Sequence, residues 1–190
     1  CLAAGRFIQS NRDKPLTVSS KGFASQAADV VTEIDIQAQE IILDILRPTI
    51  SRYGLGVLGE EGLQDDSRLR KHAFWAIDPL DGTQYFIEGS SGYATSIALV
   101  SHSGATILGV VYDPGHDHLY ASVVGGGVTR NGVPFGVKKE SIDGHLASTL
   151  LADRSLRNYP QFSVYEEQFS IRYVGGAVMN ALQLLTDPSG

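Results

Sequence analysis

The sequence has a single cysteine, no long apolar run and no cluster of basic residues. Cys1 cannot form a disulfide within the chain, which suits a reducing cytoplasm, and we expect a cytoplasmic protein. No apolar segment approaches the roughly 20 residues needed to cross a bilayer, and no signal-peptide pattern is visible, so no membrane partner is expected. The net charge of −6 argues against a nucleic-acid polymer as partner. The five histidines lack the spacing of a zinc site.

The most informative segment is Trp75–Thr83, in which an apolar run ends in two aspartates, Asp78 and Asp81. Pro79 fixes its own φ and pushes the residue before it toward an extended conformation, so the turn between the aspartates is rigid. Two carboxylates held this close repel each other unless a cation neutralises them, and Mg²⁺ prefers oxygen ligands. The Gly-Thr pair that follows can open a helix whose free N–H groups bind phosphate. The segment indicates a metal-and-phosphate site, although Asp-Pro and Asp-Gly are also common in turns.

Haloacid-dehalogenase-type phosphatases carry a related motif, Asp-x-Asp-Gly-Thr, in which the first aspartate attacks phosphorus. In the present sequence Pro79 stands at that position, and proline cannot act as a nucleophile. The sequence therefore favours attack by a metal-activated water over a covalent aspartyl-phosphate.

Two further segments accompany the first one, Asp29-x-Val31-Thr32-x-x-Asp35 and Gly59-Glu60-Glu61. In this order, the three segments resemble the pattern of the inositol monophosphatase superfamily, which comprises Mg²⁺-dependent, lithium-sensitive phosphomonoesterases. That pattern is Asp-x-Val-Thr-x-x-Asp, then Gly-Glu-Glu, then Trp-x-Ile-Asp-Pro-(Ile/Leu)-Asp-Gly-Thr. Further matches follow at residues 96–99, 109–112 and 131–132, so the resemblance spans nearly the whole chain.

The resemblance implies a metal-binding role for several of these residues. Glu60 and Asp78, assisted by the main-chain carbonyl of Leu80, would hold a first Mg²⁺, and Asp78 and Asp81 would hold a second; two or three ions are expected. Adjacent strand residues face opposite sides, and the family pattern selects Glu60 rather than Glu61 as the ligand. The carboxylate that completes the second site belongs to a Trp-Asp segment that the sequence does not contain. We therefore expect the C-terminal part of the fold to be missing.

Thr32 and Asp35 allow two compatible interpretations. Thr-x-x-Asp at the start of an apolar helix is typical of a capping box, which is a local stabilising device. The resemblance assigns the same two residues, together with Thr83, to the orientation of the attacking water, with Asp35 or Glu60 as its base. Capping and catalysis can coexist because each needs only one carboxylate oxygen.

We expect substrate contacts from six residues on two segments, the second of which is implied by the resemblance: Asp81, Gly82, Thr83, Gly175, Gly176 and Ala177. The last three occupy a strand-to-helix junction, where glycine also serves packing alone, and both interpretations stay open. Many family members carry a hydroxyl residue where Gly176 stands, so their substrate preference does not transfer. Lys21 lies in a stretch where the family often places a lysine, but a solvated surface lysine fits equally well.

Hydrophobic periodicity predicts an α+β fold in which helices pack on an antiparallel sheet. One helix is expected up to about Arg12, and a second, amphipathic helix from Ile34 until Pro48. Short apolar runs separated by turn residues predict strands at 93–100, 107–112, 118–124 and 135–137. Further strands at 146–152 and 169–174 and a helix at 177–185 suggest a second unit. We predict two domains, residues 1–143 and 144–190, the second of them truncated; the resemblance sharpens the fold to a layered αβαβα sandwich.

The resulting hypothesis is a homodimeric, Mg²⁺-dependent phosphatase that hydrolyses a small phosphate monoester with metal-activated water. Gln84-Tyr85 departs from the Asn-Phe of many inositol phosphatases and is nearer to the 3′(2′),5′-bisphosphate nucleotidase branch. Fructose-1,6-bisphosphatase is a third, weaker option. The rival from another class is a non-catalytic metal- or phosphate-binding relative. Thr32 and Thr83 argue against that rival, because binding alone does not require water-orienting hydroxyls.

Overall fold

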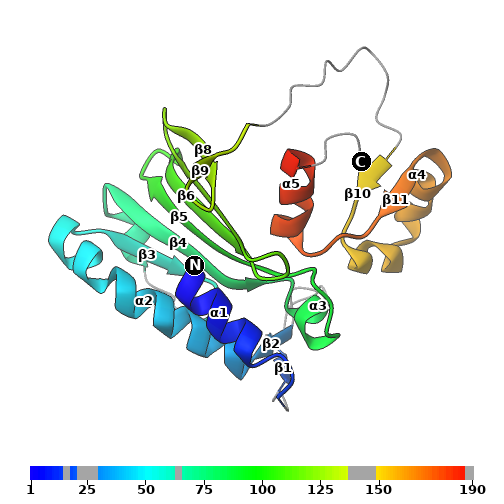
Figure 1. Cartoon of the computed structure of the whole chain (residues 1–190), viewed down its shortest axis with the longest axis horizontal. Helices are drawn as coiled ribbons and strands as arrows, with labels where there is room; N and C mark the ends of the chain where they lie inside the picture. The colour runs from blue at the N-terminus through cyan, green and yellow to red at the C-terminus, as the bar shows by residue number, and fades with distance from the viewer. Residues whose placement is uncertain (15–17, 21–29, 63–65, 137–148, 187–190) are drawn as a thin grey trace.

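The computed structural model describes residues 1–14, 18–20, 30–62, 66–136 and 149–186 (Figure 1). The α-helices in these ranges are α1 (Leu2–Ser10), α2 (Glu33–Tyr53), α3 (Thr83–Ile87), α4 (Ser163–Gln168) and α5 (Ala177–Thr186). Short 3₁₀ turns are η1 (Asp66–Leu69), η2 (Arg154–Asn158) and η3 (Pro160–Phe162). None of the helices in the described ranges has both the length and the apolar character needed to cross a membrane.

A seven-stranded sheet forms the centre of the molecule, with the strand order β3-β4-β5-β6-β7-β8-β9. Its strands are β3 (Gly56–Gly59), β4 (Ala73–Asp81), β5 (Ala94–Ser101), β6 (Thr106–Asp113), β7 (His118–Val123), β8 (Gly127–Arg130) and β9 (Val133–Pro134). The predicted antiparallel meander is confirmed from β4 onward, whereas β3 runs parallel to β4. Two small sheets accompany it, antiparallel β1 (Val18–Ser20) with β2 (Val30–Thr32), and parallel β10 (Thr149–Leu151) with β11 (Ser170–Arg172).

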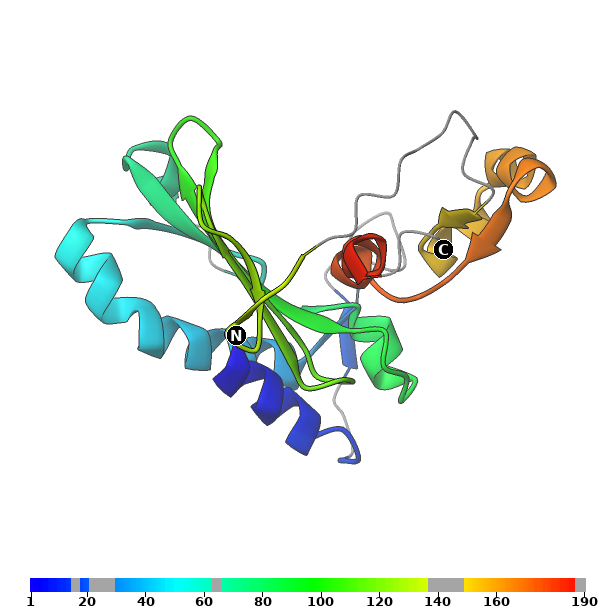
Figure 2. The same cartoon turned by 45° about the horizontal axis from the view of Figure 1, so that its top comes forward.

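The elements are layered, as Figures 1 and 2 show. Helices α1 and α2 cover one face of the large sheet and bury the main core, to which Ile8, Ile42 and Trp75 belong. Helix α5 lies on the opposite side, where its Met179 and Leu182 pack with residues of β5 and β7. Beyond α5 lie β10, β11 and α4. This succession of helix, sheet, helix, sheet and helix confirms the predicted sandwich.

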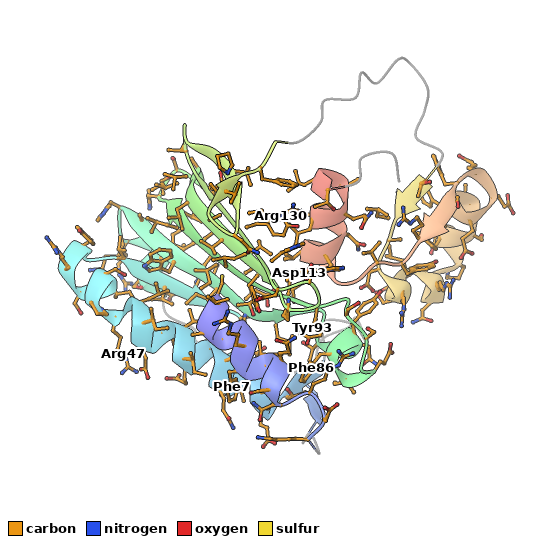
Figure 3. All side chains as sticks on the ribbon, viewed as in Figure 1. Phe7, Arg47, Phe86, Tyr93, Asp113 and Arg130 are labelled. Atoms are coloured by element: carbon orange, nitrogen blue, oxygen red, sulfur yellow. The ribbon has the colours of Figure 1, made fainter. Side chains whose placement is uncertain are left out.

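Side chains follow this layering. Phe86 and Tyr93 are buried and meet edge to face, with ring centroids 5.3 Å apart. Arg47 lies on the outer side of α2, away from the sheet (Figure 3), where it pairs with Asp44 at 2.9 Å. The predicted boundary at residue 143 lies outside the described residues.

The prediction that the second helix ends at Pro48 is wrong. Helix α2 continues to Tyr53 and ends at Gly54, which has a φ of 59° and donates its N–H to the Ile50 carbonyl. Proline inside a helix costs about 3 kcal/mol because one hydrogen bond is lost. The turn after Pro48 offsets this cost, since Ile50 packs against the main core and Thr49 accepts a hydrogen bond from the Trp75 indole at 3.2 Å.

The strand predicted at 135–137 is wrong for its described residues, 135 and 136, and β8 was missed. The sheet ends with β9 at Val133–Pro134, and Phe135 lies outside any strand, with its ring 5.6 Å from that of Tyr120. The predicted Asn131-Gly132 turn does connect β8 and β9, with φ values of 51° and 78°. Strand β8 has few apolar residues, so its place in the sheet comes from pairing with β7 rather than from a sequence pattern. Val137 lies outside the described residues.

Replacing Gly5 with alanine should lower the free energy of unfolding, although alanine is the better helix former. A Cβ at this position of α1 would lie 2.1 Å from Cδ1 of Tyr112, whose side chain is fully buried. Overpacking of this kind costs about 1–3 kcal/mol, whereas the helix propensity of alanine recovers at most about 1 kcal/mol. Urea unfolding would measure the difference. Gly109→Ala on β6 is the control, because its Cβ would meet no atom within 4 Å. Equal stability of Gly5→Ala and the wild type would contradict the close packing of α1 on Tyr112.

Candidate active site

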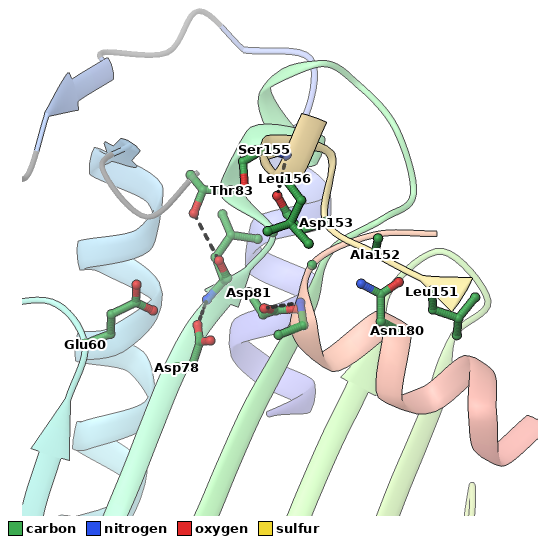
Figure 4. A pocket seen from close by; sticks show the side chains of 14 residues that line it. Glu60, Asp78, Asp81, Thr83, Leu151, Ala152, Asp153, Ser155, Leu156 and Asn180 are labelled. Atoms are coloured by element: carbon green, nitrogen blue, oxygen red, sulfur yellow. Dashed lines mark hydrogen bonds between the residues drawn. The ribbon is translucent and has the colours of Figure 1, made fainter. Parts of the chain in front are cut away.

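Glu60 and Asp78 lie side by side because β3 and β4 are parallel and in register. Gly59, the last residue of β3, pairs with Ile77 on β4. The Glu60 N–H donates to the Ile77 carbonyl at 3.1 Å, which continues this pairing by one step. The carboxylates of Glu60 and Asp78 therefore emerge at the same edge of the sheet, where both residues line a cleft (Figure 4).

A bulge in β4 separates Asp78 from Asp81. The two aspartates are three positions apart, but they pair with residues of β5 that are only two positions apart. Pro79 has no N–H to donate and is tolerated where the ladder is interrupted. Its carbonyl accepts the Thr95 hydroxyl at 2.9 Å, and the Leu80 N–H donates to Oδ1 of Asp78 at 3.1 Å. These bonds hold the turn between the two carboxylates in one conformation.

The Gly-Thr pair opens helix α3, as the sequence predicts. Gly82 has a φ of 82°, in the left-handed region that glycine adopts without strain, and caps the helix. Its carbonyl accepts the Tyr85 N–H at 2.9 Å. Gly82 and Thr83 both line the cleft. Because the first N–H groups of a helix have no acceptor within the helix, this end of α3 is suited to an anion.

A buried chain of hydrogen bonds joins the start of α2 to the start of α3. Oδ2 of Asp35 accepts the Thr32 N–H at 2.9 Å and the Thr32 hydroxyl at 2.5 Å, and the Ile34 N–H donates to that hydroxyl at 3.2 Å. The predicted capping box is therefore confirmed. The Thr83 hydroxyl lies 3.0 Å from Oδ1 of Asp35 and 3.1 Å from the Leu80 carbonyl.

Of the three residues in this hydrogen-bond network, only Thr83 reaches the cleft. Thr32 and Asp35 each expose 1% of their surface and do not line the cleft, whereas Thr83 does. Burial raises the pKa of Asp35, and the hydrogen bonds from Thr32 and Thr83 oppose this rise. Any effect of Asp35 on a bound molecule is therefore transmitted through the Thr83 hydroxyl. Of the two predicted bases, only Glu60 faces the cleft.

The cleft has a volume of about 500 Å³, a size typical of small-molecule sites. One wall comes from the motif residues Glu60, Asp78, Leu80, Asp81, Gly82 and Thr83. The other wall comes from the segment 151–156 and the start of α5, namely Leu151, Ala152, Asp153, Ser155, Leu156, Gly176, Ala177 and Asn180 (Figure 4).

Acidic side chains crowd together at the motif wall, which disfavours their charged forms. Burial, together with the charge and hydrogen bond of Glu60 and the charge of Asp81, raises the pKa of Asp78 to about 9. Burial also raises the pKa of Asp81 to about 6, against the opposing effect of backbone N–H groups from α5. Such a group of acids gains stability from a cation. The donors are oxygen atoms of carboxylates and a carbonyl, which fits Mg²⁺ or Ca²⁺ better than zinc.

In the described part of the chain, no three His, Cys, Asp or Glu side chains already converge as a complete metal cage would. The Asp81 carboxylate is turned toward α5. Oδ1 accepts the Ala177 N–H at 3.0 Å, and Oδ2 accepts the Val178 N–H at 2.9 Å. The assignment of Glu60, Asp78, Leu80 and Asp81 as metal ligands stays a prediction.

The junction before α5 serves both packing and the cleft. A Cβ on Gly175 would lie 2.5 Å from the Gly92 carbonyl oxygen, and Gly175 does not line the cleft. Gly176 donates its N–H to the same Gly92 carbonyl at 2.9 Å. Packing therefore explains Gly175, whereas Gly176 and Ala177 line the cleft as predicted substrate-binding residues would.

Gln39 supports the site and was missed by the sequence reasoning. Its amide donates to the Glu61 carbonyl at 2.6 Å and accepts the Glu61 N–H at 3.0 Å, which fixes the turn after β3. Gln39 is 2% exposed and lies four positions after Asp35, on the same face of α2. A polar residue on an otherwise apolar helical face was the available signal. Glu61 does not line the cleft.

No motif identified the segment 151–156. Asp153 caps η2 by accepting the Ser155 N–H at 2.8 Å. Arg154 contacts α3, since it pairs with Glu88 at 2.6 Å and its guanidinium lies 4.4 Å from the centre of the Tyr85 ring. These contacts anchor the second wall of the cleft against α3. Lys21 and Asp29 lie outside the described residues.

Comparisons with known proteins agree with this geometry. The model of the Inositol monophosphatase family matches residues 1–185. An Inositol-1-monophosphatase from Synechocystis is 36% identical over 166 residues, which cover 85% of this chain and 55% of that protein. The Inositol-1-monophosphatase of Bacillus subtilis is 32% identical over 139 residues, which cover 73% of this chain and 50% of that protein. The chain thus spans about half the length of the curated relatives it matches.

Among solved structures, an IMPase of Thermotoga maritima superposes with a TM-score of 0.76 at 26% sequence identity, covering 96% of this chain and 68% of that one. This match supports the layered fold independently of the sequence motifs. Because the family model extends over nearly all of the chain, the chain belongs to the inositol monophosphatase family.

Proposed function

We propose that the protein is a Mg²⁺-dependent phosphomonoesterase that hydrolyses a small phosphate monoester, with water as the nucleophile. The hydrogen-bond chain Thr32–Asp35–Thr83, which ends at an acid-lined cleft, is the observation that carries this proposal. Membership in the inositol monophosphatase family supports the same reaction class.

These hydrogen bonds fix the direction in which the Thr83 hydroxyl points its proton. A hydroxyl has one proton, and the two acceptors around it, Asp35 and the Leu80 carbonyl, both draw that proton away from the cleft. The Thr83 oxygen therefore presents its lone pairs to the cleft, where it can accept a proton of a water molecule and orient that water. Glu60 lines the same cleft, and in this proposal it would receive the proton as the water attacks.

Glu60, Asp78, Asp81 and the Leu80 carbonyl are the groups that would hold the cations, two or three ions in all. Bound Mg²⁺ would activate the water and stabilise the charge on the attacking and leaving oxygens. The N–H groups at the start of α3, where Gly82 and Thr83 line the cleft, would bind phosphate oxygens of the substrate.

The charges around the cleft favour a substrate with a single phosphate. None of the fourteen described residues that line the cleft is Lys, Arg or His. A second phosphate carries roughly −1.5 to −2 charges and needs a cationic partner when it is buried. The far wall instead offers Asp153, Ser155 and Asn180, which suit hydroxyl groups. We therefore favour a phosphorylated polyol over a bisphosphorylated nucleotide or a sugar bisphosphate.

A homodimer, a cytoplasmic location and a domain boundary at residue 143 stay predictions from the sequence. Size-exclusion chromatography with light scattering would measure the first of these directly.

Phosphate release should rise with added Mg²⁺ and stop when a chelator is added. Ca²⁺ should block it, because the larger ion binds the same acids but does not impose the short octahedral geometry of Mg²⁺. Li⁺ should inhibit as well, as the family resemblance implies. A colorimetric phosphate assay at graded ion concentrations would measure these effects. Turnover that survives chelation would refute the metal mechanism, and Mg²⁺ binding without turnover would support the non-catalytic rival.

Thr83→Val should lower kcat by about 100-fold or more, whereas Thr83→Ser should stay within about tenfold of the wild type. Valine has a similar shape but cannot orient water, and it also leaves Oδ1 of Asp35 without its hydroxyl donor. Steady-state kinetics of both variants, together with their circular dichroism, would separate a catalytic loss from unfolding. Similar kcat values for the two variants would contradict the role of the hydroxyl.

A substrate panel should give a kcat/KM for inositol 1-phosphate at least about tenfold higher than for adenosine 3′,5′-bisphosphate or fructose 1,6-bisphosphate. The expected difference corresponds to about 1.4 kcal/mol, the scale of one uncompensated charge in a partly exposed site. Preference for the adenosine compound would instead assign the protein to the nucleotidase branch and contradict the charge argument.

A further inference from the structure

The side-chain amide of Gln39 pairs with both backbone groups of Glu61. Its Nε2 donates to the Glu61 carbonyl at 2.6 Å, and its Oε1 accepts the Glu61 N–H at 3.0 Å. Two residues of an antiparallel strand pair exchange N–H and C=O bonds in the same way. In the described part of the chain, β3 lies at the edge of the large sheet and ends at Gly59. The Gln39 amide therefore provides backbone pairing at a place where the strand has already ended.

Glu60 lies between two backbone anchors that come from different elements. Its own N–H donates to the Ile77 carbonyl of β4 at 3.1 Å, and the residue after it is held by Gln39 of α2. Glu60 is exposed, and its carboxyl group meets that of Asp78 through a hydrogen bond at the cleft. Because an exposed side chain at a strand end gains little from packing, its direction depends on the backbone on either side. Gln39, which is 2% exposed, fixes one of these sides.

The same face of α2 also holds Thr83. Asp35 lies one helical turn before Gln39, about 6 Å along the helix axis, and Oδ1 of Asp35 accepts the Thr83 hydroxyl at 3.0 Å. Thr83 and Glu60 line the cleft, whereas Asp35 and Gln39 lie behind it. One helix, which is itself packed in the main core, thus holds both the hydroxyl and the backbone beside Glu60.

We propose that Gln39 is a positioning residue: it holds the backbone beyond Glu60 and thereby sets the place of the Glu60 carboxylate relative to the Thr83 hydroxyl. The role of Glu60 as acceptor of the water proton rests on the proposed function, whereas the effect of Gln39 on the backbone of Glu60 does not.

Gln39→Met should change both the backbone and the reaction. Methionine has a similar length and suits a helix, but it removes both hydrogen bonds to Glu61. In metal-free buffer, NMR should show amide exchange at Glu60 and Glu61 that is about tenfold faster or more, because the end of β3 is released. At saturating Mg²⁺, kcat for the best substrate should fall by about tenfold or more, since a displaced base transfers protons poorly. KM should change little, because Glu60 is not among the predicted substrate contacts.

Gln9→Met is the matched control. The Gln9 amide also donates to a backbone carbonyl, that of Pro114 at 3.1 Å, but neither residue lines the cleft. This variant should leave both kcat and the exchange at Glu60 unchanged. Gly5→Ala, which should lower stability away from the cleft, should likewise keep the kcat of the wild type below its unfolding temperature. A comparable fall of kcat in these controls would overturn the positioning role, because any loss of stability would then lower the rate.

A double-mutant cycle with Glu60→Gln identifies the residue through which Gln39 acts. Once the Glu60 carboxylate is absent, its place no longer matters, so Gln39→Met should lower kcat by about twofold or less in that background. The same loss in both backgrounds would overturn the proposal. Should Gln39→Met fail to fold, Gln39→Glu replaces it in the cycle, because a carboxylate can still accept the Glu61 N–H. Failure of both variants to fold would overturn the proposal as well.

The exchange measurement also separates this proposal from the proposed function. A wild-type protein that hydrolyses none of the phosphate monoesters would contradict the proposed function, and exchange at Glu60 in Gln39→Met would then decide the positioning role by itself. The same measurement decides it if turnover of Glu60→Gln is too low to compare. Unchanged exchange at Glu60 would overturn the positioning role even in an active phosphatase.

Discussion

The parallel register between β3 and β4 is the constraint on which the rest of the site depends. With Gly59 opposite Ile77, the next residues along the two strands are Glu60 and Asp78, so two acids from separate segments emerge together. A slip of one residue would turn one of these side chains to the other face of the sheet. Trp75 and Ile77 are buried against α1 and α2, and this packing opposes such a slip. The hydrophobic core thus determines the distance between two charged groups.

The acids that this register brings together are unfavourable for the protein alone, since burial and mutual repulsion raise the pKa of Asp78 to about 9. The structure limits this cost in two ways. Asp78 stays bonded to the Leu80 N–H, and Asp81 turns toward the N–H groups of α5, whose positive end stabilises a carboxylate. The second of these bonds also attaches α5 to the large sheet. The same carboxylate therefore contributes both to the electrostatics of the cleft and to the docking of α5.

Glycine residues permit the close approach of backbone segments beside the cleft. Gly92 and Gly175 approach too closely for a Cβ on either one, and Gly176 leaves room for a carboxylate. The opposite wall depends on Arg154, which reaches α3 through Glu88 and the Tyr85 ring. The cleft is therefore formed between two parts of the chain that touch through a few polar contacts and close backbone approaches, in addition to the apolar packing under α5.

The sequence by itself determined the features that arise between near neighbours in the chain. The capping box of Thr32 and Asp35, the turn around Pro79 and the opening of α3 at Thr83 all follow from residues within a few positions, because hydrogen bonds and proline geometry act locally. The family motifs, which occur in the expected order along the sequence, identified the acidic residues as candidate metal ligands.

The tertiary structure alone decided the contacts that join distant residues. Thr83 meets Asp35 across 48 positions, and Asp81 meets the start of α5 across 96. Likewise α2 continues past Pro48, because packing of its last turn against the core offsets the lost hydrogen bond. Such contacts depend on strand register and helix docking, which are set by the burial of apolar side chains from the whole chain, and no local pattern of residues records them.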